Sequence, residues 1–165
     1  MDKHCVFRSD LLSGTDVGAD LVSVKVFDAD DKEIAVENGT IVKLMGYLEG
    51  SREVMKAVLA AAGDDTKDCA IIGTPEVMYD ERKKNLDEFI NEAGTIARGY
   101  IPRSRNLYSV TKEGFVGGAV PTATGSTSTV GIGANGKLDK SATGWGTVEA
   151  IETAGRYTYY LIKIA

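Results

Sequence analysis

The chain has 165 residues and a net charge of −5 at pH 7, with 43% hydrophobic and 26% charged residues. This length suits one globular domain with its own core. The negative balance argues against nucleic acid as the main partner, because binding phosphates requires clustered, uncancelled Lys and Arg. The sequence contains no apolar run near the roughly 18 residues of a membrane-spanning helix, so no membrane partner is expected.

The N-terminal part divides into two regions. Residues 1–20 are polar and turn-rich, and we expect them to form an N-terminal arm rather than a core element. Residues 21–27, LVSVKVF, alternate and are rich in β-branched side chains, which predicts a strand. This strand begins a single β-rich domain that we expect to cover residues 21–165.

Turn signals separate the next elements. Asn38-Gly39 is a strong hairpin signal and leads into an alternating strand over residues 40–45. Residues 53–61 suit either a strand or a helix, because their alanines favour a helix while the valines suit both. Their turn-bounded setting favours a strand. Residues 69–73 then predict a short buried strand.

One helix is expected in the middle of the chain. Between Asp80 and Ala93 the apolar residues Leu86, Phe89, Ile90 and Ala93 have helical spacing, with acidic residues at the start and Gly94 at the end. A long extended loop across the surface is the competing interpretation. Two strands, 96–101 and 107–111, are expected to follow.

The last third of the chain begins with a Gly/Ser/Thr-rich segment, residues 117–146, that we place within the domain. Residues 127–132 have strand character, and Asn135-Gly136 is a second hairpin signal. Residues 147–151 and 157–164 are strongly β. The fold expected is therefore mainly β: a compact β-barrel or β-sandwich-like domain with one short helix and a polar N-terminal arm.

The sequence offers no recognisable catalytic centre. The one histidine, His4, lies in the arm, where we expect it to be exposed, and no second histidine completes a triad or a zinc site with Cys5 and Cys69. The acidic cluster around Asp30 lacks the glycine and the distal glutamate of a calcium loop. We therefore expect a protein that is not an enzyme and has no metal and no cofactor.

Residues 74–115 contain the most informative pattern. Fourteen of these forty-two residues are charged, several are aromatic, and none is His or Cys. A surface so rich in polar and aromatic groups without a nucleophile–base pair indicates a contact surface rather than an active site.

This region also resembles a segment of tailed-bacteriophage virion proteins, small structural proteins made alongside the major capsid protein. The similar residues are TPEVMYDER at 74–82, LDEFINEAG at 86–94, ARGY at 97–100 and LYSVT at 107–111, together with VEAIE at 148–152 and YTYY at 157–160.

The resemblance implies a capsid decoration (cement) protein. Proteins of this family are β-rich, bind the outside of the expanded head, often cluster as trimers at local three-fold axes, and stabilise the shell. It implies the major capsid protein as partner, a homo-oligomer with a trimer favoured, and a place on the capsid exterior after assembly in the host cytoplasm. It supplies no catalytic residues. The alternatives are another virion component, such as a tail-tube, head-completion or fibre-base protein, and a β-barrel binding module or small enzyme unrelated to phages.

Eight residues are candidates for contacting a partner. Four lie in the arm, and three are arginines that either pair with carboxylates on a capsid subunit or form a solvated face, which is the commoner case. The eighth is the lone tryptophan, which anchors an interface or plugs one end of the barrel. They are Phe7, Arg8, Leu11, Leu12, Arg98, Arg103, Arg105 and Trp145. Truncation of the arm is expected to weaken binding to expanded shells.

Overall fold

The computed structural model describes residues 2–14 and 20–165, and these residues form ten strands and several single 3-10 turns. The strands are β1 (Leu21–Phe27), β2 (Ile41–Tyr47), β3 (Val54–Leu59), β4 (Cys69–Ile72), β5 (Ala97–Tyr100), β6 (Leu107–Val110), β7 (Thr129–Ile132), β8 (Leu138–Asp139), β9 (Gly146–Ala154) and β10 (Tyr157–Ile164). The 3-10 turns are η1 (Ser9–Leu11), η2 (Thr66–Asp68), η3 (Leu86–Glu88), η4 (Lys112–Gly114), η5 (Val116–Gly118) and η6 (Ala134–Gly136). The prediction of a mainly β protein is confirmed.

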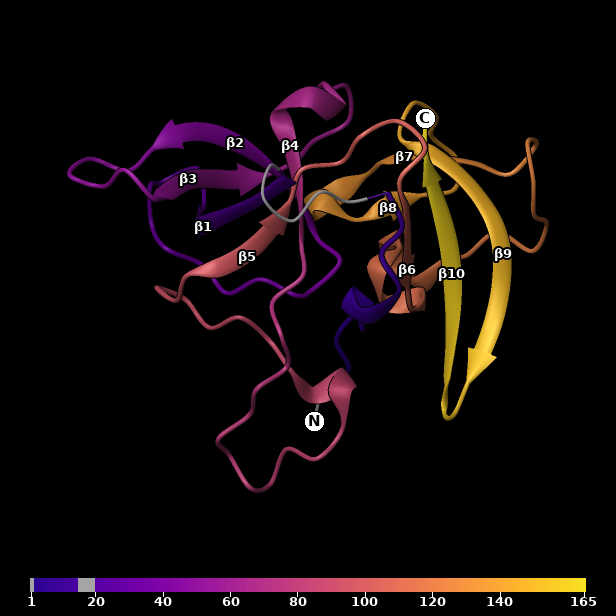
Figure 1. The fold of residues 1–165 in the computed structure, drawn as a ribbon, viewed down its shortest axis with the longest axis horizontal. Helices are drawn as coiled ribbons and strands as arrows, with labels where there is room; N and C mark the ends of the chain where they lie inside the picture. Colours follow the sequence, from indigo (N-terminus) through magenta and orange to yellow (C-terminus); the bar gives the residue numbers. More distant parts are fainter. Residues whose placement is uncertain (1, 15–19) are drawn as a thin grey trace.

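The first half of the chain closes into a five-stranded barrel in the order β1-β3-β2-β4-β5 (Figure 1). All neighbouring strands are antiparallel except β1 and β3, which run parallel. Alternating residues such as Val24, Val42, Ala57 and Ile72 fill the interior of the barrel. Among the described strands β1 to β5, closure leaves no unpaired edge.

The second half forms a five-stranded sheet in the order β6-β10-β9-β7-β8. Its longest contact is the antiparallel hairpin of β9 and β10, which lies opposite the barrel in Figure 1. The expected turn at Asn135-Gly136 is present, because β7 pairs with β8 on either side of it. A side chain at Gly136 would meet the carbonyl oxygen of Ile41 at 2.1 Å, so glycine is required where this turn touches the barrel.

A single apolar layer joins the barrel to the sheet. Ile41 and Ile71 point outward from the barrel and belong to the same buried cluster as Trp145, Val148 and Ile162 from the sheet. At about 25 cal/mol for each Å² of apolar surface removed from water, this layer makes a large contribution to stability. The two sheets therefore share a core.

The N-terminal residues differ from the expected loose arm. Cys5, Val6 and Phe7 are each no more than 3% exposed, and Phe7 forms an antiparallel bridge with Val110 on the edge of β6. A second bridge joins Ser13 to Leu107. Because these contacts supply the main-chain partners that the edge strand β6 otherwise lacks, residues 2–14 are part of the fold.

The prediction of a helix over residues 80–93 is wrong. The structure contains only the single 3-10 turn η3 there, at whose start the carboxylate of Glu88 accepts a hydrogen bond from the main-chain amide of Asn85 at 2.9 Å, and the rest of residues 74–91 is an extended loop. Leu86 is 41% exposed whereas Phe89 is 8% exposed, so the apolar residues of this stretch do not pack as one helical face. The competing interpretation, a long surface loop, is the observed one.

The turn at Asn38-Gly39 has a different role from the one its sequence predicts. The turn forms, with Gly39 at a φ of 79°, but the segments on either side do not pair with each other. Val36 bridges Asn91 instead, while β2 pairs with β3 and β4. The other predicted strands are confirmed, including residues 53–61 as a strand.

The packing of Phe7 gives a first test. Replacing Phe7 with Ala removes a ring that contacts Tyr100 and Tyr108 at centroid distances of 5.8 and 6.0 Å. We expect the free energy of unfolding in urea to fall by about 3–5 kcal/mol. The matched change Leu11→Ala, at a residue 50% exposed, is expected to cost less than about 0.5 kcal/mol. Equal effects of the two substitutions contradict the buried placement of this segment.

Candidate functional site

The most prominent surface feature is the loop of residues 74–91 between β4 and β5, which we call the projecting loop. In Figure 1 it extends below the body of the molecule, away from both sheets. Both of its ends are held by Asn38, whose side chain is 1% exposed. Its amide nitrogen donates to the carbonyl of Thr74 at 2.8 Å, and its oxygen accepts from the amide nitrogens of Thr74 and Asn91, each at 3.1 Å.

The returning half of the loop is anchored to the body. Asp87 is 6% exposed, accepts a hydrogen bond from the hydroxyl of Tyr157 at 3.1 Å, and lies 3.9 Å from the guanidinium of Arg156. The main chain of Asp87 also accepts from the amide of His4 at 2.8 Å. These contacts fix residues 84–91 against the β9–β10 hairpin and the N-terminal segment.

The outgoing half is different because its apolar side chains face solvent. Val77 is 59% exposed and Tyr79 is 94% exposed. Asp80 pairs with Arg82 at 2.8 Å, and this guanidinium lowers the pKa of Asp80 to about 2. An almost fully exposed aromatic ring on a loop with anchored ends is an arrangement suited to contact with another molecule.

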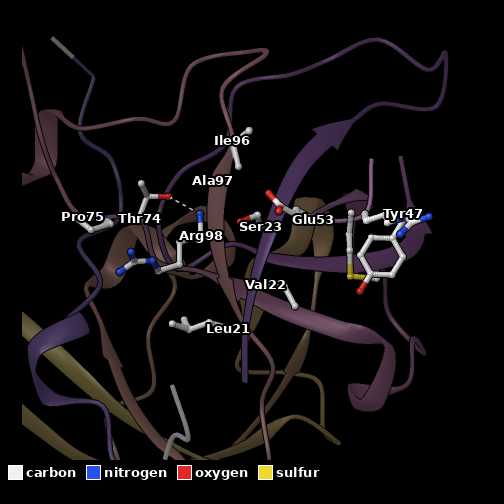
Figure 2. Close-up of a pocket in the computed structure, with 12 residues that line it drawn as sticks. Leu21, Val22, Ser23, Tyr47, Glu53, Thr74, Pro75, Ile96, Ala97 and Arg98 are labelled. Atoms are coloured by element: carbon white, nitrogen blue, oxygen red, sulfur yellow. Dashed lines mark hydrogen bonds between the residues drawn. The ribbon is translucent and has the colours of Figure 1, made fainter. Parts of the chain in front are cut away.

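A groove crosses the outer surface of the barrel beside Thr74 and Pro75, the first residues of the projecting loop (Figure 2). Its volume is about 570 Å³, and its lining includes Leu21, Tyr47, Arg52, Met55, Ile96 and Arg98. We call it the β1 groove, since β1 contributes Leu21, Val22 and Ser23 to its lining. Figure 2 shows Thr74 and Pro75 on one side and Tyr47 on the other.

A β-bulge on one side of the groove and a hydrogen bond on the other orient the side chains that line it. The pairing of β2 with β3 shifts register between Leu44 and Tyr47, where Gly46 has a φ of 106°. Such a bulge redirects the following side chains, and Tyr47 emerges 64% exposed. On the other side, the hydroxyl of Thr74 accepts from the amide of Arg98 at 3.0 Å, which ties the loop's first residue to β5.

The charges around the groove favour an acidic partner. Arg52 and Arg98 are both exposed, and within the described part of the chain neither guanidinium forms an ion pair. Glu53 is the one acidic residue of the lining. The groove therefore combines apolar walls with two guanidinium groups that are available to a carboxylate.

The structure separates the four candidates near the N-terminus. Phe7 lies in the core and is inaccessible to a partner. Arg8 is held by Asp10, with a nitrogen–oxygen distance of 2.6 Å, and lies over the ring of Tyr159 at 5.1 Å. Leu12 is half-buried against the shared core, whereas Leu11 is exposed. Of the four, Leu11 is the side chain most open to a partner.

The other candidates also have different surroundings. Arg98 lines the β1 groove, while Arg103 and Arg105 lie in the turn before β6. Arg103 lies 2.6 Å from Asp20, and Arg105 is exposed with a φ of 71°. Trp145 is 1% exposed in the shared core, so it neither anchors an interface nor plugs an end of the barrel.

Potentially reactive groups are buried or paired. His4 is half-buried and lies 3.2 Å from Glu37, so it is not the exposed arm residue expected. Burial raises the pKa of the Cys5 thiol to about 12 and that of Cys69 to about 11. Within residues 2–14 and 20–165, no three His, Cys, Asp or Glu side chains form a group able to hold a metal ion.

Comparison with protein-family models, with curated proteins and with solved structures finds no match to this chain. In the part of the chain that the structure describes, no helix has the length and apolar character needed to cross a membrane. The candidate site is therefore defined by geometry: the projecting loop and the β1 groove.

The sequence pattern indicates a contact surface over residues 74–115, with a surface loop as the competing interpretation of residues 80–93, but it contains no sign of the groove. The groove brings together residues from β1, β2, β3 and β5 that are far apart in the chain, so no local pattern marks it. The one available signal was an aromatic residue, Tyr47, following Gly46 near the end of an alternating strand.

The thiol pKa values predict slow labelling and a specific pH dependence. Both cysteines are buried, so we expect a thiol reagent at pH 8 to label the unfolded chain rapidly and the native protein hardly at all. Because the fold keeps these thiols protonated above their ordinary pKa of 9.0, the free energy of unfolding is expected to fall as the pH rises from about 9 toward 12.

The control is the double variant Cys5→Ala/Cys69→Ala, measured by urea denaturation over the same pH range. Its decline in stability above pH 9 is expected to be shallower than that of the natural chain. Identical slopes in the two proteins contradict the assignment of this pH dependence to the thiols.

The buried indole of Trp145 gives another test. Its Nε1 donates to the hydroxyl of Tyr108 at 2.6 Å, and both residues are about 1% exposed. Trp145→Phe leaves the hydroxyl without this donor, and we expect a loss of about 1–3 kcal/mol in the free energy of unfolding. In a double-mutant cycle with Tyr108→Phe, the combined loss is expected to be smaller than the sum by at least about 0.5 kcal/mol. Strict additivity contradicts the hydrogen bond.

Proposed function

We propose that this chain is a structural protein of a tailed-phage virion: a capsid decoration protein that binds the outside of the expanded head and stabilises it. Its partners in this proposal are the major capsid protein and other copies of itself, with a trimer favoured. The support is twofold. The segment that resembles phage virion proteins begins at Thr74, and the same segment forms the projecting loop.

The observation that carries the proposal is the exposure of Tyr79 at 94% on a loop whose two ends are held by the buried Asn38. Folding leaves the ring of Tyr79 exposed to solvent although both ends of its loop are hydrogen-bonded to the body of the protein. Burying a side chain of this size at an interface contributes about 1.5–3 kcal/mol. The loop is therefore suited to supply contacts within a decorated shell, either to a capsid subunit or to a neighbouring copy.

Repetition on the shell strengthens a modest contact. A head presents the same binding surface many times, and an oligomer that engages several surfaces at once gains avidity without additional contacts. A small acidic protein with one exposed contact loop fits this mode of binding, in which each single contact need not be tight.

The role of the N-terminal residues changes in this proposal. An arm that orders on binding was one expected source of contact area, but Cys5, Val6 and Phe7 are already in the core. Truncating residues 2–8 therefore tests the stability of the fold rather than the contact with the shell. The projecting loop replaces the arm as the proposed contact element.

The proposal is tested by co-sedimentation of the purified protein with unexpanded and expanded shells of the source phage, followed by cryo-EM of the pellet. We expect the protein on expanded shells alone. The double variant Val77→Ser/Tyr79→Ser is expected to bind at least about tenfold more weakly, because the two lost apolar contacts together cost more than about 1.4 kcal/mol.

The matched control is Ile151→Ser, which replaces an exposed apolar side chain on β9 and is expected to leave binding unchanged. Absence of the protein from both kinds of shell contradicts a decoration role. Rings or tubes formed by the protein alone then point to a tail or neck component, and a tightly bound small molecule points to a binding module.

A further inference from the structure

The projecting loop begins at the edge of the β1 groove, yet the loop does not fill the groove. Thr74 and Pro75 lie at the edge of the groove and also begin the loop. The loop then leads away, and Tyr79 is 94% exposed, so this ring does not occupy the groove of its own chain. Each copy thus presents one unfilled groove and one solvent-exposed aromatic loop.

We propose that the β1 groove of one copy receives the projecting loop of a second copy, with Tyr79 entering between the apolar side chains of Tyr47 and Ile96. This inference rests on the homo-oligomer in the proposed function and identifies the contact that builds it. Tyr47 and Ile96 are 64% and 54% exposed, so both lose water when the ring is seated.

The two surfaces are complementary in charge. Residues 74–91 contain five acidic and three basic side chains, so the loop is net negative. The lining of the groove contains two arginines and one glutamate, so it is net positive. Glu81 is exposed two residues after Tyr79 and forms no ion pair with any described residue. It is therefore the carboxylate best placed to meet Arg52 or Arg98.

The groove is also the right size for such an insertion. Its volume of about 570 Å³ lies within the range of roughly 300–1,000 Å³ of pockets that enclose small ligands. This space accommodates an aromatic ring together with its neighbours on the loop. The anchored ends of the loop reduce the entropy lost on binding, because less of the chain must become ordered.

The proposed contact joins two different surfaces. Copies linked in this way form a closed ring if the rotation between them closes, and an open filament if it does not. In a ring each copy gives one loop and receives one, so no groove and no Tyr79 remains exposed. A trimer on a three-fold axis is one such ring.

The experiment is an intermolecular disulfide between loop and groove in the absence of shells. Two single variants of the full chain, Asp80→Cys beside the inserted ring and Glu53→Cys in the lining of the groove, are co-expressed with different tags, purified together at about 100 µM and oxidised mildly. We expect a covalent dimer containing both tags. The native cysteines are buried and do not contribute to it.

The control pair is Asp80→Cys with Thr153→Cys, a position also exposed to solvent on β9, for which no mixed dimer is expected. A mixed band no stronger than that of the control overturns the proposal, including the case in which the protein is a monomer. Shell binding by the natural chain is measured in parallel. Binding without the cross-link overturns the loop–groove contact alone, whereas the loss of both overturns the decoration role as well.

A second readout is the dissociation constant of the oligomer from sedimentation equilibrium. Tyr79→Ser and Arg98→Glu are each expected to raise it at least about tenfold, because one removes the inserted ring and the other reverses a charge in the groove. Ile151→Ser is expected to leave it unchanged. Equal dissociation constants for all three variants contradict the proposal.

Discussion

The rest of the structure depends on the apolar layer between the barrel and the second sheet. The barrel closes on itself, so its interior is complete without the second half of the chain, but its outer face at Ile41 and Ile71 is not. The sheet covers that face, and the N-terminal segment with Phe7 pairs with the edge strand β6. Once this layer is formed, the rest of the outer surface of the barrel remains exposed to solvent.

Two surface features, the projecting loop and the β1 groove, remain exposed after this packing. The projecting loop and the β1 groove meet at Thr74, whose main chain is held by Asn38 and whose hydroxyl is bonded to β5. Their relative position is therefore set by the barrel itself. Both elements are thus presented on a rigid support.

The strands could be predicted from the sequence because alternation and turn residues are local signals. Residues 21–27 and 157–164 were predicted with the bounds observed. The errors have a common cause, which is that tertiary contacts overrode local pattern. The residues from Asp80 to Ala93 have helical spacing, but Phe89 is buried while Leu86 is exposed, so they do not share one packed helical face. The polar N-terminal residues conceal a buried Cys5-Val6-Phe7, and the groove assembles from four strands. None of these contacts leaves a periodic signal.

The way in which Asn38 holds the projecting loop has a consequence for the evolution of this protein. The side-chain amide of Asn38 bonds to the main chain of Thr74 and to the side chain of Asn91. These hydrogen bonds do not depend on the side chains of the residues between the two ends of the loop. Residues 76–83 contribute little to the core, and substitutions there carry little penalty in folding. The fold therefore places few constraints on this stretch during evolution, and the constraints that remain are those of the proposed contact through Val77 and Tyr79. A peptide inserted at Tyr79 is thus expected to leave the fold intact while removing that contact.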